Sequence, residues 1–137
     1  MTEIITKSSA ETEAFAENFA NTLKGGEIIA FKGGLGMGKT CFTRGLATGL
    51  GFKGQVTSPT FAIINEYIGG RLPLYHFDMY RIESWADLDS CGYFDYCDMG
   101  GVVVAEWSEN IENALEGNVI TVTFERIDEN TRKITIN

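Results

Sequence analysis

Basic residues are scarce in this 137-residue chain, which has eleven lysines and arginines against nineteen aspartates and glutamates, a formal net charge of -8. Affinity for nucleic acid comes mainly from clustered lysine and arginine, so we expect no direct sequence-specific binding of nucleic acid. Apolar runs of roughly 18 residues, the length that a membrane-spanning helix needs, are also missing. We therefore expect no membrane partner.

Cysteine is equally sparse, and Cys41, Cys91 and Cys97 have no C-x-x-C spacing. An odd number argues against a disulfide framework, and the spacing argues against a zinc site. We expect free thiols in a reducing cytoplasm. Residues 1–6 lack the basic start and apolar stretch of a secretory signal, which agrees with a cytoplasmic location.

A glycine-rich stretch, residues 33–40, fits the phosphate-loop pattern G-x-x-x-x-G-K-[ST] at every fixed position. Residues 27–31 before it are typical of a short buried strand, and residues 40–50 after it are typical of a helix. Glycines let several main-chain N–H groups turn toward one anion, and the helix N-terminus adds its own unpaired amides. Lys39 would lie along the β- and γ-phosphates of a nucleotide, and the Thr40 hydroxyl would ligate Mg²⁺. The alternative is a glycine-rich turn beside a surface lysine, but the flanking strand and helix favour a nucleotide site.

The chain before the glycine-rich stretch predicts an edge strand at residues 3–6 and then an amphipathic helix capped by Ser8 or Ser9. Its expected buried stripe is Ala14, Phe15, Phe19, Ala20 and Leu23.

Beyond the glycine-rich stretch, residues 61–68 and 72–78 predict a hairpin around two glycines. Ser84 is a candidate cap for a short helix, residues 89–99 predict an irregular or weakly helical insert, and residues 108–115 predict a brief helix. The apolar run at residues 102–105 is typical of a parallel strand covered on both faces. Residues 119–124 and 133–136 predict an antiparallel hairpin. Residues 1–137 therefore predict one α/β domain of the P-loop NTPase kind, with a mixed, mostly parallel sheet flanked by helices and a C-terminal antiparallel hairpin.

Two carboxylates follow predicted strands, Asp78 and Glu106. In α/β sheets, functional groups gather at the carboxyl ends of strands, where the phosphate loop also emerges. Either acid could hold the magnesium ion, and the other could orient or deprotonate the attacking water. The alternative is that both are solvated acids at strand ends. His76 shares a strand face with Asp78, and we expect it to be structural or, at most, a supporting neighbour of the site.

Residues 55–61 carry three hydroxyl side chains around Pro59, which keeps the segment out of a regular sheet. Ser58 and Thr60 could belong to a switch that senses a γ-phosphate or its metal. A Ser/Thr-rich turn is the alternative.

Trp107 either packs in the core or stacks on a ligand. Arg44 and Arg81 could neutralise phosphate charge, although a solvated arginine is the more usual state.

Four stretches occur in the order and spacing typical of one protein family: residues 33–40, 58–61, 75–81 and 106–107. The chain resembles the TsaE family (formerly YjeE), small bacterial P-loop ATPases required for the threonylcarbamoyladenosine (t6A37) modification of tRNA. The resemblance implies a cytoplasmic ATPase that uses ATP and Mg²⁺ and acts on the complex of TsaD and TsaB.

The resemblance also assigns roles to particular residues. The catalytic residues would be Asp78, Glu106 and Lys39. Thr40 and Glu106 would hold magnesium. Thr60 would belong to the switch, and Trp107 would lie near the site. The nucleotide-binding residues would be Gly33, Gly36, Met37, Gly38, Lys39, Thr40 and Cys41. The family usually has an acid where Gly34 stands and a hydroxyl residue where Cys41 stands. A thiol is a poor hydrogen-bond donor, so a contact from Cys41 to the α-phosphate would be weak.

Two other functions fit a phosphate loop. A kinase acting alone on a small substrate would need a lid and an acceptor pocket, for which this chain has little room. A nucleotide-gated adaptor would bind ATP and a partner with hardly any turnover. Because the chain has no obvious arginine finger of its own, slow hydrolysis in isolation is expected.

Overall fold

The computed structural model describes residues 2–33, 38–54, 64–79, 82–106 and 115–137. The expected crossing segment at residues 55–61 and nearly all of the expected helix at 108–115 lie outside these residues. The helices and strands in the described part are β1 (Thr2–Thr6), α1 (Ser9–Ala20), β2 (Ile28–Lys32), α2 (Lys39–Gly49), β3 (Ile64–Tyr67), β4 (Leu74–Asp78), α3 (Trp85–Ser90), α4 (Tyr93–Cys97), β5 (Val102–Glu106), β6 (Val119–Arg126) and β7 (Arg132–Ile136).

The described strands form one seven-stranded sheet in the order β1-β7-β6-β2-β5-β4-β3. Its centre is parallel, because β2 pairs in parallel with both β5 and β6, and β4 pairs in parallel with β5. Both edges are antiparallel: β1 and β6 pair with β7, and β3 pairs with β4. The predicted mixed sheet and its C-terminal hairpin are confirmed. Among the parallel strands, β2, β4 and β5 are buried along most of their length and on both faces, and they are the most apolar, as parallel strands usually are.

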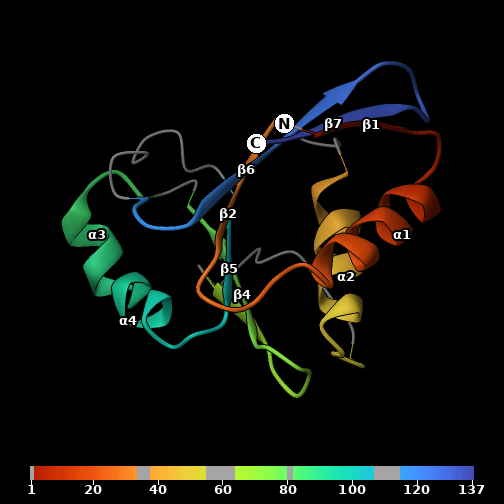
Figure 1. The fold of residues 1–137 in the computed structure, drawn as a ribbon. Coiled ribbons are helices and arrows are strands. Elements are labelled where there is room, and N and C mark those ends of the chain that lie inside the picture. Colours follow the sequence, from red (N-terminus) through yellow and green to blue (C-terminus); the bar gives the residue numbers. More distant parts are fainter. Residues whose placement is uncertain (1, 34–37, 55–63, 80–81, 107–114) are drawn as a thin grey trace.

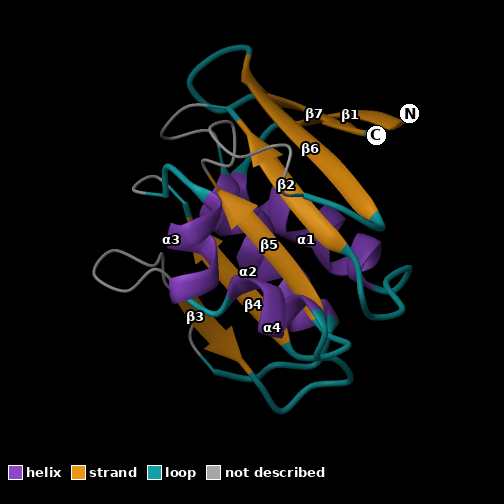
Figure 2. Cartoon of the chain, turned by 90° about the vertical axis from the view of Figure 1, so that its left-hand side faces the viewer, coloured by secondary structure: helices purple, strands orange, loops and turns teal. Residues whose placement is uncertain are grey.

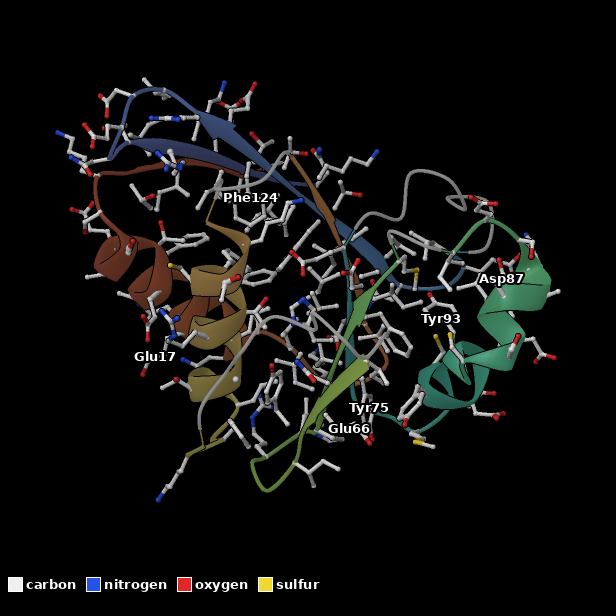
Figure 3. All side chains as sticks on the ribbon, turned by 180° about the vertical axis from the view of Figure 1, so that it is seen from behind. Glu17, Glu66, Tyr75, Asp87, Tyr93 and Phe124 are labelled. Carbon is white, nitrogen blue, oxygen red and sulfur yellow. The ribbon has the colours of Figure 1, made fainter. Side chains whose placement is uncertain are left out.

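Helices cover both faces of the sheet, which makes three layers (Figure 1). Helices α1 and α2 lie on one face, and α3 and α4 lie on the other. Figure 2 shows the central strands running side by side between these two layers. Phe124 lies on the α1–α2 side and Tyr93 on the α3–α4 side (Figure 3), where they belong to two separate clusters of buried side chains.

Helix α1 begins at the predicted cap, because the Ser8 side chain accepts a hydrogen bond from the Glu11 N–H at 3.1 Å. The predicted stripe is wrong at Ala14, which is exposed. The buried residues of α1 are Thr12, Ala16 and Ala20, spaced four apart, whereas Phe15 and Phe19 are partly buried at the side of this stripe. Small residues line the contact because α2 lies very close. A side chain at Gly45 of α2 would meet the Glu13 carbonyl and the Ala16 methyl group.

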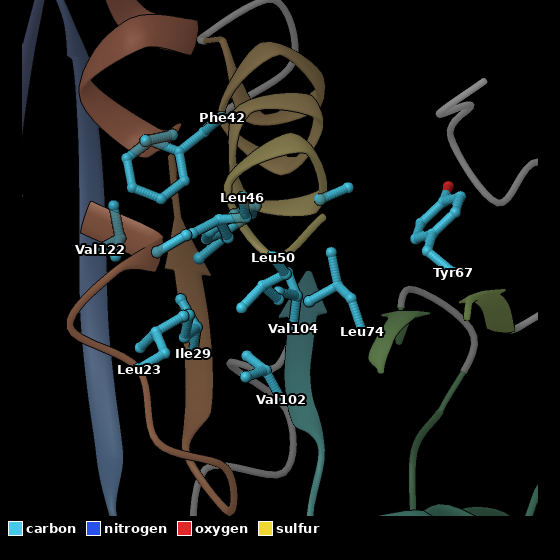
Figure 4. Packing of buried hydrophobic residues seen from close by; sticks show 14 of the residues in the cluster. Leu23, Ile29, Phe42, Leu46, Leu50, Tyr67, Leu74, Val102, Val104 and Val122 are labelled. Carbon is cyan, nitrogen blue, oxygen red and sulfur yellow. The ribbon is translucent and has the colours of Figure 1, made fainter. Parts of the chain in front are cut away.

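Helix α2 packs its apolar stripe onto the sheet, with Phe42, Leu46 and Leu50 almost entirely buried. Figure 4 shows these three side chains pointing toward β2, β5 and β6. Phe42 meets Phe31 of β2 and Phe124 of β6 edge to face, with ring centroids 5.6 Å away in both cases. This geometry adds about 0.5–1.5 kcal/mol per aromatic pair to the effect of burial. The packing fixes the start of α2 against the end of β2.

Ser84 caps α3 as predicted, and its side chain accepts a hydrogen bond from the Asp87 N–H at 3.2 Å. The segment expected to be irregular or weakly helical contains the five-residue helix α4, which begins after Gly92. Tyr93 of α4 and Leu88 of α3 are buried against Phe77 of β4. These two short helices therefore cover the face of the sheet that α1 and α2 leave open.

Candidate nucleotide site

The glycine-rich stretch starts at the carboxyl end of β2 and leads into α2, and its two described glycines occupy positions that require glycine. Gly33 has a φ of 131° and Gly38 a φ of 96°, in the region that residues with a side chain rarely adopt. A Cβ at Gly33 would lie 2.7 Å from the Phe124 carbonyl oxygen. The chain therefore leaves the sheet through a tight passage against β6, which only glycine permits.

Helix α2 begins at Lys39, one residue earlier than predicted, with Gly38 as its N-cap. Because glycine has no side chain, no side-chain hydrogen bond caps this helix end. Uncapped amides and the positive end of the helix dipole favour an anion. Lys39 is 7% exposed. Burial to this degree argues against the alternative of an ordinary surface lysine.

Asp78 and Glu106 are the last residues of neighbouring parallel strands, and their Cα atoms are direct partners in the register. Glu106 is also the register partner of Phe31 on its other side. Three strands thus end level with one another, and the glycine-rich stretch continues from the first of them. This arrangement confirms that both acids lie at the carboxyl edge of the sheet.

The two acids also lie on the face that α2 covers. Side chains alternate between the two faces of a strand. Leu74 and Val104 belong to the cluster under α1 and α2, so Asp78 and Glu106, at even spacing from them, point to the same side. The start of α2, with Lys39, and the strand-end acids Asp78 and Glu106 therefore lie at the same edge of the sheet.

Glu106 is held by a histidine. The Nε2 atom of His76 lies 2.6 Å from Oε2 of Glu106, and the side chains are 0% and 11% exposed. The sequence placed His76 beside Asp78, on the same strand. The two residues do share one face of β4, and the structure adds a contact to Glu106, which His76 reaches diagonally across the β4–β5 register. Only the register of two strands far apart in the chain reveals this contact, so sequence reasoning missed it.

Glu27 is also a buried acid, but its carboxylate is hydrogen-bonded differently from that of Glu106. Its two carboxylate oxygens accept hydrogen bonds from the N–H groups of Lys24 and Gly25, both at 2.7 Å. Glu27 therefore stabilises the turn before β2, at the opposite end of the strand from the site. In the described residues, the Glu106 carboxylate is bonded through one oxygen, to His76. Glu106 is the better placed of the two to take a further ligand.

The donor set fits magnesium bound together with a nucleotide. Thr40 would supply a hydroxyl oxygen and Glu106 or Asp78 a carboxylate oxygen, the hard ligands that Mg²⁺ prefers. Within the described ranges, no three Asp, Glu, His or Cys side chains gather into a group that could hold a metal ion. Mg²⁺ is usually bound by one or two protein side chains with water and substrate phosphates, so a complete protein cage is not expected here.

The other residues predicted for the site fall into two groups. Cys41 is in the first turn of α2 and is partly buried. Arg44 lies one turn further on, where its NH1 atom is 3.5 Å from Oε2 of Glu13 on α1, so its ion pair is with a neighbouring helix. Five predicted residues lie outside the described part of the chain: Gly36, Met37, Ser58, Thr60 and Trp107. Arg81 lies outside it as well.

Comparison with known proteins decides the family. The family described as "Threonylcarbamoyl adenosine biosynthesis protein TsaE" matches residues 6–134. The chain belongs to the TsaE family. It is 41% identical to the TsaE protein of Bacillus subtilis over 130 residues, which are 95% of this chain and 81% of the relative. It is 35% identical to the TsaE protein of Treponema pallidum over 132 residues, 96% of this chain and 97% of the relative.

The fold agrees with TsaE membership. The crystal structure of YdiB from Bacillus subtilis superposes with a TM-score of 0.82 at 37% identity, covering 98% of this chain and 83% of YdiB. The predicted fold class is thus confirmed. Membership also places this chain among proteins of tRNA threonylcarbamoyladenosine biosynthesis. Across the part of the chain that the structure describes, every helix is too short or too polar to cross a membrane.

Proposed function

We propose that this TsaE-family protein is a magnesium-dependent ATPase that serves the threonylcarbamoyladenosine modification of tRNA by acting on the TsaD–TsaB complex in the cytoplasm. The observation that carries the proposal is the convergence of the α2 N-terminus with Asp78 and Glu106 at one corner of the sheet. A bound nucleotide needs main-chain amides that contact its phosphates and a cation that neutralises them. The carboxylates hold this cation from the side facing away from the phosphates.

The proposal assigns a role to each residue of the candidate site. The amides at the start of α2 and Lys39 bind the phosphates, and Thr40 and Glu106 hold Mg²⁺. When bound, Mg²⁺ neutralises charge on the phosphate oxygens. Asp78, at the end of β4, is placed to orient the attacking water or to share the cation. Nucleotide binding also draws on Gly33, Gly38 and Cys41, together with Gly36 and Met37, and the switch comprises Ser58 and Thr60, with Trp107 near the site.

In the described part of the chain, each arginine bonds to groups of the protein itself, and this supports slow hydrolysis in isolation. Arg44 pairs with Glu13, and Arg71 donates to the carbonyls of Ala20 and Leu23, both at 2.9 Å. Arg126 and Arg132 both donate to the Asp128 carbonyl in the β6–β7 hairpin. An arginine finger raises phosphoryl-transfer rates by about 10³–10⁵-fold, so a partner that supplies one would have a large effect.

The test measures phosphate release from ATP by the purified protein, alone and with the TsaD–TsaB complex. We expect slow release alone and stimulation by the complex, both abolished by Lys39→Ala. Lys53→Ala is the matched control, because Lys53 is an exposed lysine just beyond α2. Binding of ATP and of the complex without stimulated turnover would favour the adaptor. Phosphate transfer to a small molecule without the complex would favour the kinase.

A further inference from the structure

His76 occupies a position where an apolar residue would be expected. It is the middle residue of β4, is fully buried, and pairs with Asn65 of β3 and Val104 of β5 in the register. Its neighbours on the same face include Leu74 and Val104, which belong to the core under α1 and α2. Strands on both sides therefore fix the backbone of His76 and restrict its ring.

Stability alone does not account for a histidine at this position. Burying a polar ring costs free energy unless both nitrogens are hydrogen-bonded. The Nε2 atom meets Oε2 of Glu106, but the Nδ1 atom has no hydrogen-bond partner among the described residues. A leucine or valine would continue the apolar face of β4 without that cost. The one polar contact that His76 gains is the one to Glu106.

The partner of this contact is the carboxylate assigned to the cation. A glutamate side chain has three rotatable bonds, and an unpaired carboxylate at 9% exposure is unfavourable. A hydrogen bond of 2.6 Å from a buried, restricted ring fixes one carboxylate oxygen, and among the described residues Oε1 is left available to another ligand. Groups that hold a metal ligand in place in this way typically change metal affinity or activity by about 10–100-fold when they are replaced.

We propose that His76 is a positioning residue for magnesium: its Nε2–H group holds Oε2 of Glu106, so that the carboxylate is already oriented when the cation arrives with the nucleotide. The inference rests on the proposed function, because Glu106 must ligate the cation. It assigns His76 no contact with nucleotide or metal.

Three substitutions separate positioning from packing. In His76→Gln the amide nitrogen reaches about as far as Nε2 of the imidazole and can donate to Glu106. In His76→Asn the amide is one methylene shorter and falls short of the carboxylate. His76→Leu keeps the apolar face and removes the donor. If the leucine variant does not fold, the glutamine and asparagine pair, both polar and uncharged, still gives the comparison.

The readout is the affinity for a non-hydrolysable ATP analogue by calorimetry, measured once with Mg²⁺ and once with EDTA, together with the midpoint of thermal unfolding. The ratio of the two affinities is the magnesium-dependent gain. We expect His76→Leu and His76→Asn to reduce this gain by about 10–100-fold. We expect His76→Gln to keep most of it. The affinity in EDTA, which comes from Lys39 and the main-chain amides, should stay the same in all three variants.

Two results would overturn the inference while leaving the proposed function in place. One is a full magnesium-dependent gain in His76→Asn and His76→Leu, whatever their thermal midpoints. The other is a loss of affinity that is equal with Mg²⁺ and with EDTA, which is what a purely structural role predicts. If the unaltered protein shows no magnesium-dependent gain, or if Glu106→Gln keeps it, Glu106 does not hold the cation. The proposed role of Glu106 then fails, and the role of His76 fails with it.

Discussion

Replacement of Gly45 by valine tests how closely α1 and α2 approach each other. A Cβ atom at position 45 would lie 2.7 Å from the Ala16 Cβ and would also meet the Glu13 carbonyl. Ordinary contact between such carbon atoms is roughly 3.5–4.0 Å, so the helices must separate by about 1 Å. Two further methyl groups enlarge the conflict.

The magnitude follows from the cost of overpacking a well-packed contact. That cost is typically about 1–3 kcal/mol, and valine belongs in the upper part of the range because it adds three carbon atoms. Valine has a slightly better helix propensity than glycine, which offsets a few tenths of a kcal/mol. We therefore expect Gly45→Val to reduce the free energy of unfolding by about 2–3 kcal/mol.

The assay is urea unfolding followed by circular dichroism. With a urea dependence of about 1–3 kcal/mol per molar, the midpoint should fall by about 0.7–3 M. Thr48→Val is the matched control, because it places the same side chain on an exposed position of the same helix. Its effect should stay within about 0.5 kcal/mol. Equal midpoints for the two variants would refute the close helix contact.

Two further substitutions test other parts of the molecule. The pKa of Tyr93 is raised above its ordinary value, mainly by burial and to a smaller extent by the neighbouring Cys97. The unfolded chain releases this proton near pH 10 while the folded protein retains it, so folding stability falls as the pH rises above about 10. Tyr93→Phe should lose less stability between pH 9 and 11 than the unaltered protein, and identical losses would contradict the assignment. Cys41→Ser replaces the thiol by a hydroxyl, a better hydrogen-bond donor, and if position 41 donates to the α-phosphate, the nucleotide affinity should rise by about 2–10-fold. An unchanged dissociation constant would show that position 41 makes no such contact.

The parts of the fold that depend on local patterns could be predicted from the sequence. Ser8 and Ser84 cap helices as their spacing indicated, and the apolar run before Glu106 forms a strand buried on both faces. The glycine signals marked the β3–β4 hairpin and the start of α2. These features are local because capping, turn geometry and hydrophobic period act within a few residues.

Features that depend on packing between distant segments could not be predicted. The stripe of α1 was misplaced at Ala14 because two glycines of α2 bring the helices together and select Ala16 and Ala20 as the contact. The pairing of His76 with Glu106 depends on the β4–β5 register, which nothing within either strand reveals. The placement of Asp78 and Glu106 at the carboxyl ends of strands, where the glycine-rich stretch also begins, was predicted from the sequence, whereas their direct pairing in the register comes only from the topology.

The central claim is that a nucleotide polyphosphate binds at the N-terminus of α2 with a cation between it and the strand-end carboxylates. A crystal structure with a non-hydrolysable ATP analogue and Mg²⁺ tests this most directly. We predict phosphate density over the amides between Gly33 and Thr40, and a cation bound by Thr40 and by Glu106 or Asp78, directly or through water. A nucleotide bound elsewhere, or a cation with neither carboxylate in its coordination sphere or hydrogen-bonded to its waters, would contradict the account.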